Sequence, residues 1–239
     1  MTPAIRHPFR VVPWNRDFLK ALLDMAVEEC GGDLKRAVFL FPHARPKRYL
    51  ALLLRDDPRL ARPLIMPAMH TVGELFRTMA GRLHAQPAWS ASRLDRVGLL
   101  LTCVREETGE RPDTWDARRF FPWGLRLASL FEECFSQCRR PENFLHVDSV
   151  SPFAALLLER LGNIFARYER SLLERGWTTP GHEAFTVAEF LARERRLPPG
   201  RLPGHADSRP VYIAGFHLLT GAENALFRLL WEEHGARVA

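Results

Sequence analysis

Short apolar runs alternate with amphipathic segments over the first 84 residues of the chain, and the same alternation returns at its end. Four of these runs predict β-strands: Phe9–Pro13, Ala37–Phe41, Leu64–Met69 and Val211–Ala214. Runs that are apolar at nearly every position are typical of strands buried on both faces of a parallel sheet, and parallel strands need crossover connections such as helices. The pattern therefore predicts an α/β fold built on a parallel sheet.

Capping residues indicate where the helices between these strands begin. Three polar residues stand at helix N-cap positions: Asp17, Thr71 and Thr220. The first of these helices is expected to end at Gly31, and the second to cover Val72–Leu83. Glu223 follows the third cap at the spacing of a capping box. A further helix is expected over Lys47–Leu54, after a loop at Pro42–Pro46.

The middle of the chain has a different pattern. Four segments show helical periodicity, and no strand is predicted among them: Ser90–Glu107, Trp115–Arg139, Pro152–Arg175 and His182–Arg195. Leu197–Arg209 is rich in Pro, Gly and Arg and is predicted to be a linker. The sequence thus predicts a discontinuous sheet domain, residues 1–84 and 205–239, interrupted by a helical insertion with its linker, residues 85–204. Because His234–Ala239 reads as a helix end followed by the start of a strand, we expect the chain to be a piece of a longer protein.

The amino-acid composition indicates the class of protein but not a reaction. The chain has 239 residues, 46% of them hydrophobic and 26% charged, as globular proteins do. Its formal net charge of +6 permits a polyanionic partner. Four cysteines without disulfide-framework spacing suit a reducing compartment. Since there is no signal-peptide core and no apolar run that could span a bilayer, a cytoplasmic location without a membrane partner is expected.

The loop after the first predicted strand is where a nucleotide-binding sheet would hold a Gly-rich phosphate loop ending in Gly-Lys-Ser/Thr. The residues found there are Trp14, Asn15, Arg16 and Asp17. A bulky tryptophan and an acidic helix start would obstruct and repel a pyrophosphate. The last predicted strand runs into Ala214 and Gly215, where a nucleotide hydrolase would need carboxylates for magnesium. These residues predict a degenerate nucleotide site and no cofactor.

A second loop offers positive charge at a sheet edge. Arg45, Lys47 and Arg48, with Tyr49 beside them, follow a predicted strand at the edge where open α/β sheets bind ligands. Cations and an aromatic ring near a helix start suit a nucleic-acid backbone and a stacked base. The alternative is a solvated helix start with Tyr49 packed into the core.

The pair that follows the next predicted strand is open to two interpretations as well. His70 and Thr71 lie just before a predicted helix. They either face a ligand at the sheet edge or act as a plain N-cap preceded by a histidine in solvent or in the core.

No catalytic or metal-binding residue is predicted. Cys134 and Cys138, with His146 beyond them, raise the question of a metal site, but both cysteines belong to one apolar stripe and are interpreted as small hydrophobic residues. A histidine, an aspartate and two serines within residues 146–151 are close only in sequence, which is not triad geometry. None of the three lysines has a Glu two residues before it, as a nuclease centre of the Glu-x-Lys type would require.

Three segments together resemble one family. They are Ala37–Leu50 (AVFLFPHARPKRYL), Leu64–Phe76 (LIMPAMHTVGELF) and Val211–Glu223 (VYIAGFHLLTGAE). In order and spacing they are similar to segments of UvrD/RecB-like superfamily 1 helicases, and more closely to AddB-type helicase–nuclease subunits, with a helical insertion between the second and the third. The resemblance implies a RecA-like, P-loop NTPase-like domain interrupted by an all-helical domain. Since the phosphate loop and the acidic strand end are missing, it implies the degenerate branch of the family.

The resemblance also implies a function. The chain would be a non-catalytic, helicase-like DNA-binding segment of a bacterial helicase–nuclease that acts in double-strand-break repair and recombination, and the parent protein would carry a PD-(D/E)XK nuclease, a hydrolase. Single-stranded or end DNA would lie beside Arg45, Lys47, Arg48, His70 and Thr71. A motor or nuclease subunit, or the rest of the same chain, would be the protein partner. Two alternatives stay open: a docking module that binds no DNA, and a nucleotide hydrolase with a non-standard loop.

Overall fold

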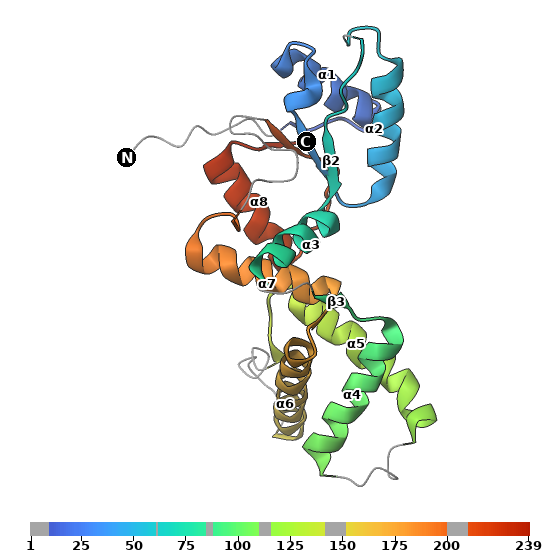
Figure 1. Cartoon of the computed structure of the whole chain (residues 1–239), viewed down its shortest axis with the longest axis vertical. Coiled ribbons are helices and arrows are strands. Elements are labelled where there is room, and N and C mark those ends of the chain that lie inside the picture. Colours follow the sequence, from blue (N-terminus) through green and yellow to red (C-terminus); the bar gives the residue numbers. More distant parts are fainter. Residues whose placement is uncertain (1–9, 61, 85–87, 110–115, 142–151, 200–209) are drawn as a thin grey trace. The chain divides into compact units, whose positions relative to one another are not determined.

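The computed structural model describes residues 10–60, 62–84, 88–109, 116–141, 152–199 and 210–239, and it divides into two compact units (Figure 1). Unit 1 comprises residues 1–83 and 188–239, and unit 2 comprises residues 84–187. Unit 1 is an α/β unit, and unit 2 is mostly helical.

The sheet of unit 1 is parallel throughout. Its four strands run in the order β2 (Ala68–Thr71), β1 (Val38–Phe41), β5 (Val211–Ile213) and β6 (Arg237–Val238). Val38 of β1 lies opposite Ala68 of β2 on one side and Val211 of β5 on the other. The two central strands, β1 and β5, therefore come from segments far apart in the chain. All residues of β1 and β5 are buried, as expected for strands covered on both faces.

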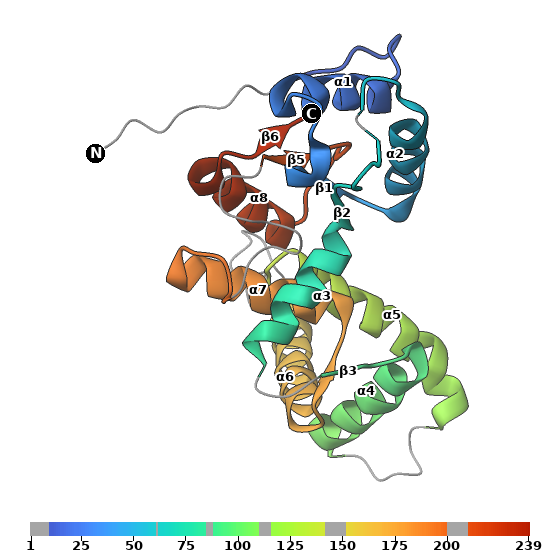
Figure 2. The ribbon, with the colours of Figure 1, turned by 45° about the horizontal axis from the view of Figure 1, so that its top comes forward.

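Helices cover both faces of this sheet. Phe39, Phe41 and Tyr212 pack against α1 (Phe18–Cys30) and α2 (Ala44–Asp56), and the Phe39 and Tyr212 rings stack with centroids 5.0 Å apart. Because side chains alternate along a strand, Val38 and Leu40 face the opposite way. On that side lie α3 (Val72–Leu83), which contacts β2, and α8 (Gly221–His234), which contacts β5; Figure 2 shows α1 and α2 on one side of the strands and α8 on the other.

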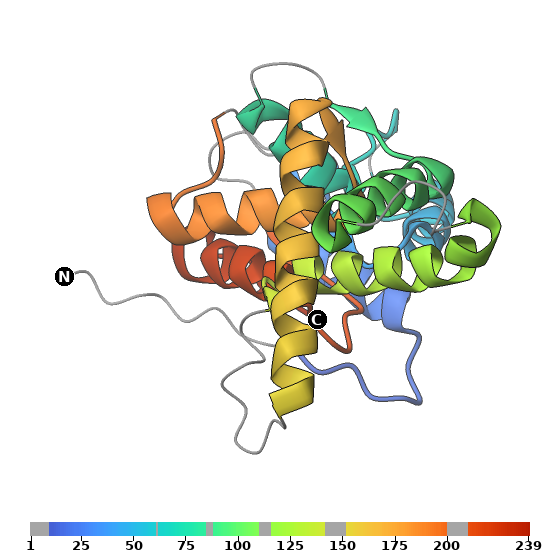
Figure 3. The ribbon, with the colours of Figure 1, turned by 90° about the horizontal axis from the view of Figure 1, so that it is seen from below.

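Unit 2 is built on α4 (Arg93–Thr108), α5 (Ala117–Ser136) and α6 (Pro152–Glu174), with the first part of α7 (Pro180–Glu194). In Figure 3, α4 lies beside α5, and α4 packs against both α5 and α6. Its core contains an aromatic cluster in which Phe131 meets Phe165 edge to face, with centroids 4.9 Å apart. Cys134 is buried within this core, in agreement with its interpretation as a hydrophobic residue.

The structure confirms the predicted N-caps at Asp17 and Thr220. Asp17 accepts a hydrogen bond from the Lys20 N–H, and the Thr220 hydroxyl accepts one from the Glu223 N–H in a complete capping box. Gly31 ends α1 at φ 59°, a left-handed conformation that glycine adopts without strain. The predicted final strand is present as β6.

The structure differs from the sequence prediction in four respects. The third strand begins at Ala68 instead of Leu64, because Pro67 has no N–H to donate to the β1 ladder. Helix α2 begins at Ala44, and Pro46 lies in its first turn, where a missing N–H costs no helical hydrogen bond.

The other two differences concern strands. Residues 10–13 form no strand, although the Arg10 N–H donates to the Val238 carbonyl at 3.0 Å; Phe9 lies outside the described residues. In the helical unit, β3 (Trp89–Ser90) and β4 (Trp177–Thr178) form a parallel pair that was not predicted. Two-residue strands contain no periodicity that a sequence pattern could reveal.

The second boundary between the units lies within α7 and not at residue 204. Ala188 and the residues after it belong to unit 1, where Leu191 and Ala192 share a pocket of about 310 Å³ with Gly221 and Asn224 of α8. Residues 195–199 of the region that follows form neither helix nor strand, and residues 200–209 of the predicted linker lie outside the described part.

Arg195 follows α7 in the left-handed region, at φ 50°. A non-glycine residue pays about 1 kcal/mol or more for that conformation. We therefore expect Arg195→Gly to raise the free energy of unfolding by about 1 kcal/mol in urea titrations followed by circular dichroism. Arg196, which has no positive φ, provides the control, and Arg196→Gly should show no such gain.

Candidate nucleic-acid interface

The carboxyl ends of the four parallel strands meet at one edge of the sheet in unit 1. Four helices begin at this edge: α1 after the Trp14–Arg16 turn, α2 after β1, α3 after β2 and α8 after β5. In open α/β sheets this is the edge that binds ligands, because the loops and the helix N-termini there present backbone N–H groups.

Three of these four helix starts already hold a carboxylate. Asp17 caps α1 and accepts from the Lys20 N–H at 3.1 Å. Glu74 accepts from the Thr71 N–H at 2.8 Å, and Glu223 accepts from the Thr220 N–H at 2.8 Å. A negative charge at a helix start both satisfies its N–H groups and repels phosphate. The start of α1, where a phosphate loop would lie, is therefore unsuited to bind a pyrophosphate.

Helix α2 is the exception among the four. Its N-cap, His43, makes no capping hydrogen bond with its side chain, and its first turn contains no acidic residue. Arg45, Lys47 and Arg48 lie in its first turns instead. The helix dipole and these cations act in the same direction, so this is the helix start at the sheet edge that favours an anion.

The outward side of α2 exposes an aromatic ring beside its cations. Tyr49 is 51% exposed, and the Arg45 guanidinium lies over its ring at 5.8 Å from the centroid. The alternative in which Tyr49 packs into the core is therefore wrong. Arg45 and Arg48 are exposed, and neither forms an ion pair with a described residue. A cation over an exposed ring can receive a stacked base with its phosphate.

Lys47 and Thr71 are engaged locally. Lys47 Nζ lies 3.1 and 3.0 Å from the two carboxylate oxygens of Glu74, and Thr71 Oγ1 accepts from the Glu74 N–H at 3.2 Å. The Thr71 N–H and then the Lys47 ammonium lower the pKa of the Glu74 carboxyl below its ordinary value. This network ties the start of α3 to α2, and His70, half-buried at the end of β2, lies beside it. The predicted residues thus divide: Arg45 and Arg48 face solvent with Tyr49, whereas Lys47, His70 and Thr71 lie at the α2–α3 junction.

The predicted degenerate nucleotide site coincides with a pocket of about 550 Å³ at the same edge. Trp14, Arg16 and Gly215 line it, together with His43 and His217. Gly215 turns the chain there at φ 78°, as the sequence suggested. The described residues that line the pocket include no Asp or Glu, so none of them could hold a magnesium ion through a carboxylate.

The remaining three residues of that prediction lie elsewhere. Asn15 and Asp17 are not among the lining residues, and Ala214 is buried at the strand end, where its N–H donates to the Leu40 carbonyl at 3.0 Å. Trp14 itself is 99% exposed at the rim. The pocket therefore lies at the carboxyl edge of the sheet with no carboxylate among its described lining residues.

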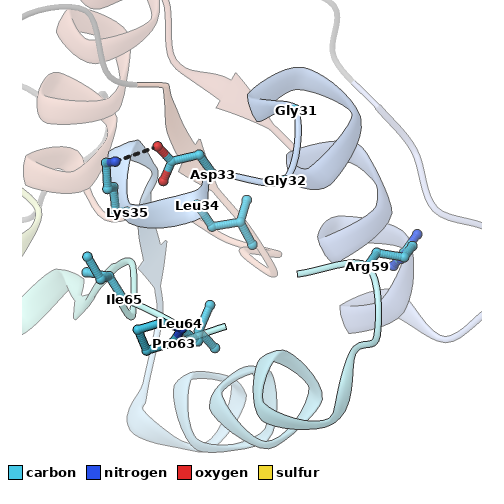
Figure 4. Close-up of a pocket in the computed structure, with 9 residues that line it drawn as sticks. All are labelled: Gly31, Gly32, Asp33, Leu34, Lys35, Arg59, Pro63, Leu64 and Ile65. Atoms are coloured by element: carbon cyan, nitrogen blue, oxygen red, sulfur yellow. Dashed lines mark ion pairs between the residues drawn. The ribbon is translucent and has the colours of Figure 1, made fainter. Parts of the chain in front are cut away.

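A second pocket of about 370 Å³ lies near the opposite edge, beside the segments that lead into β1 and β2 (Figure 4). Its two cations are neutralised by neighbours: Lys35 Nζ lies 2.8 Å from Asp33, and Arg59 lies 2.7 Å from Asp57. With its charges paired in this way, the pocket is a poorer phosphate site than the start of α2.

The described residues offer no metal centre and no membrane span. No group of three His, Cys, Asp or Glu side chains among them is arranged to hold a metal ion. His146, Asp148, Ser149 and Ser151 lie outside the described residues. No helix in the described part combines the length and the apolar character needed to cross a bilayer.

Comparison with protein-family models gives no match to this chain, and comparison with curated proteins gives none.

Proposed function

We propose that this chain is a non-catalytic, helicase-like segment that binds single-stranded or end DNA, as part of a bacterial helicase–nuclease acting in double-strand-break repair and recombination. In this proposal unit 1 is a RecA-like domain with a degenerate ATP site, and unit 2 is the helical domain inserted into it. A parallel sheet whose chain leaves after α3 and returns at α7 and β5 supports this assignment.

The observation that carries the proposal is the outward side of α2. It combines an exposed tyrosine ring, an arginine over that ring and a second arginine that forms no ion pair with a described residue, at a helix start whose own first turn contains no acidic residue. Phosphates would contact Arg45 and Arg48, and a base would stack on Tyr49. Lys47, His70 and Thr71 would hold α2 and α3 in place at this edge.

Salt-dependent binding tests the proposal. The whole chain would be titrated with a fluorescent thymidine oligonucleotide at several salt concentrations. The logarithm of the association constant should fall linearly with that of the salt concentration, by about 0.7 for each phosphate neutralised on a single strand. Affinity that does not change with salt contradicts phosphate contacts.

Tyr49→Ala tests the stacked base separately. Loss of one base–aromatic stack should weaken binding by about 1–3 kcal/mol, roughly 5- to 150-fold, with an unchanged salt slope because no charge is removed. Leu52 is the matched control, since it lies on the same helix, is 48% exposed and has no ring. Leu52→Ala should bind as the wild type does.

A docking module is the second candidate, and a specific observation favours it. Val11, Trp14 and Leu218, which surround the sheet-edge pocket or follow its lining residues, are 74%, 99% and 91% exposed. Large exposed apolar groups of this kind are typical of protein-binding surfaces. A motor or nuclease subunit, or a further part of the same chain, would cover them. This candidate predicts no affinity for the oligonucleotide even at low salt.

A further inference from the structure

The outward face of α5, in the helical unit, combines an exposed tryptophan ring with arginines. Trp123 is 64% exposed. Arg118, Arg119 and Arg126 are exposed on the same helix. From Ala117 to Phe131 the helix contains no acidic residue. Arg118, Arg119, Trp123 and Arg126 are together called the α5 face.

Helical geometry explains why these groups lie together. Arg119, Trp123 and Arg126 follow one another at spacings of four and three residues, which places them on one side of an α-helix. The other side is fixed in the core. Phe120 is buried, and a Cβ at Gly124 would come within 2.7 Å of a Val97 methyl group. Because the buried side fits so closely against α4, the helix has no freedom to rotate and hide Trp123.

The arginines of the α5 face differ from others in the same unit. Arg140 is bound to Glu169 at 2.7 Å, and Arg167 to Glu107 at 2.9 Å. No ion pair joins Arg118, Arg119 or Arg126 to any residue that the structure describes. The Arg126 guanidinium lies instead over the Trp123 ring, 5.5 Å from its centroid.

We infer that the α5 face is a binding surface for single-stranded nucleic acid, with a base stacked on Trp123 and phosphates held by the three arginines. Surfaces that bind single strands combine positive charge with exposed aromatic rings, and Arg contributes both charge and stacking. A second copy of the chain is a poor occupant, because a symmetric contact would set unpaired arginines against the same arginines. The inference goes beyond the proposed function, since this face lies in the other unit and requires no residue of α2.

The test uses the whole chain and the thymidine oligonucleotide. Trp123→Ala should weaken binding roughly tenfold, and Trp123→Phe should recover most of the loss because a ring is restored. Arg119→Glu with Arg126→Glu should weaken binding by at least about 25-fold near 0.1 M salt and lower the salt slope by about 1.4. Leu130, which is 42% exposed and belongs to the same helix, is the control, and Leu130→Ala should leave affinity unchanged.

The binding measurements on these variants either support or overturn the inference about the α5 face. Unchanged affinity in Trp123→Ala and in the double variant, with circular dichroism showing intact helices, overturns the inference. Variants that alter self-association in sedimentation experiments but not oligonucleotide affinity overturn it in favour of a protein contact. If only the α2 variants weaken oligonucleotide binding, the inference about the α5 face fails and the proposed binding at α2 stands. If only the α5 variants weaken it, the α5 face binds the oligonucleotide and the proposed binding at α2 fails.

Discussion

Gly181→Ala is expected to destabilise the helical unit by about 3 kcal/mol, the largest stability effect anticipated for a single methyl group in this chain. A Cβ at Gly181 would lie 2.7 Å from the carbonyl oxygen of Glu132 and 3.2 Å from its Cα, both backbone atoms of α5. Neither atom belongs to a side chain that could swing away. The start of α7 would have to withdraw from α5, and overpacking of this kind costs about 1–3 kcal/mol.

Withdrawal would also break a hydrogen bond to a charged group. The Gly181 N–H donates to Glu132 Oε2 at 2.9 Å, and Glu132 lies near Arg96 as well, at 3.6 Å. A hydrogen bond to a charged group contributes about 1.5–3 kcal/mol. Urea unfolding followed by far-UV circular dichroism measures the combined loss of stability from steric crowding and from the broken hydrogen bond.

Gly98 provides the matched control for this prediction. It lies in the interior of α4, in the same unit, and a Cβ there would have no neighbour within 4 Å. Gly98→Ala should therefore stabilise the protein by about 1 kcal/mol through helix propensity alone. Because the two alanine variants are expected to change the free energy of unfolding in opposite directions, comparing them separates steric crowding from the effect of alanine on the backbone. A Gly181→Ala protein as stable as the wild type would contradict the close contact between Gly181 and Glu132.

Reversing the charges of Arg45 and Arg48, which form no ion pair with any described residue, is expected to have the largest effect on binding. If Arg45 and Arg48 each neutralise one phosphate, their loss lowers the salt slope by about 1.4 and the association constant by about 25-fold near 0.1 M salt. Arg45→Glu with Arg48→Glu should exceed that figure, because repulsion replaces attraction. The fold should tolerate the change, since glutamates near a helix N-terminus interact favourably with the helix dipole.

A control with the same change of charge excludes a general electrostatic effect. Arg193 and Arg196 are 75% and 70% exposed at the end of α7, where both pair with Glu194. Arg193→Glu with Arg196→Glu should reduce affinity far less than the α2 variant. Equal losses in the two double variants would show that net charge, and not the start of α2, governs binding.

Much of the fold was readable from the sequence because local signals agreed with tertiary packing. The boundaries of α3 and the capping box at Thr220 depend on residues within one turn of each other, and such signals survive folding unchanged. The start of β2 was misplaced because the apolar run continues through Pro67, although that residue lacks the ladder donor. The β3–β4 pair joins residues far apart in the chain, and only the folded structure brings them together.

The sequence predicted which residues lie at the candidate site but not what each side chain contacts there. The sequence indicated cations at the start of α2, yet the division between free Arg45 and paired Lys47 depends on Glu74, which lies on another helix. The exposure of Tyr49 likewise depends on which side of α2 meets the sheet. The α5 face was missed because Trp123 resembles a core residue when only hydrophobicity is considered.

The pairing of Val38 with Val211 has a consequence for biosynthesis. A ribosome adding 5–20 residues per second completes β5 roughly 10–30 s after β1, and the whole of residues 84–187 emerges in between. During that time the apolar segment Val38–Phe41 of the nascent chain has no β5 strand to pair with. Chaperone dependence and aggregation of prematurely terminated chains are the expected cellular signature of this connectivity.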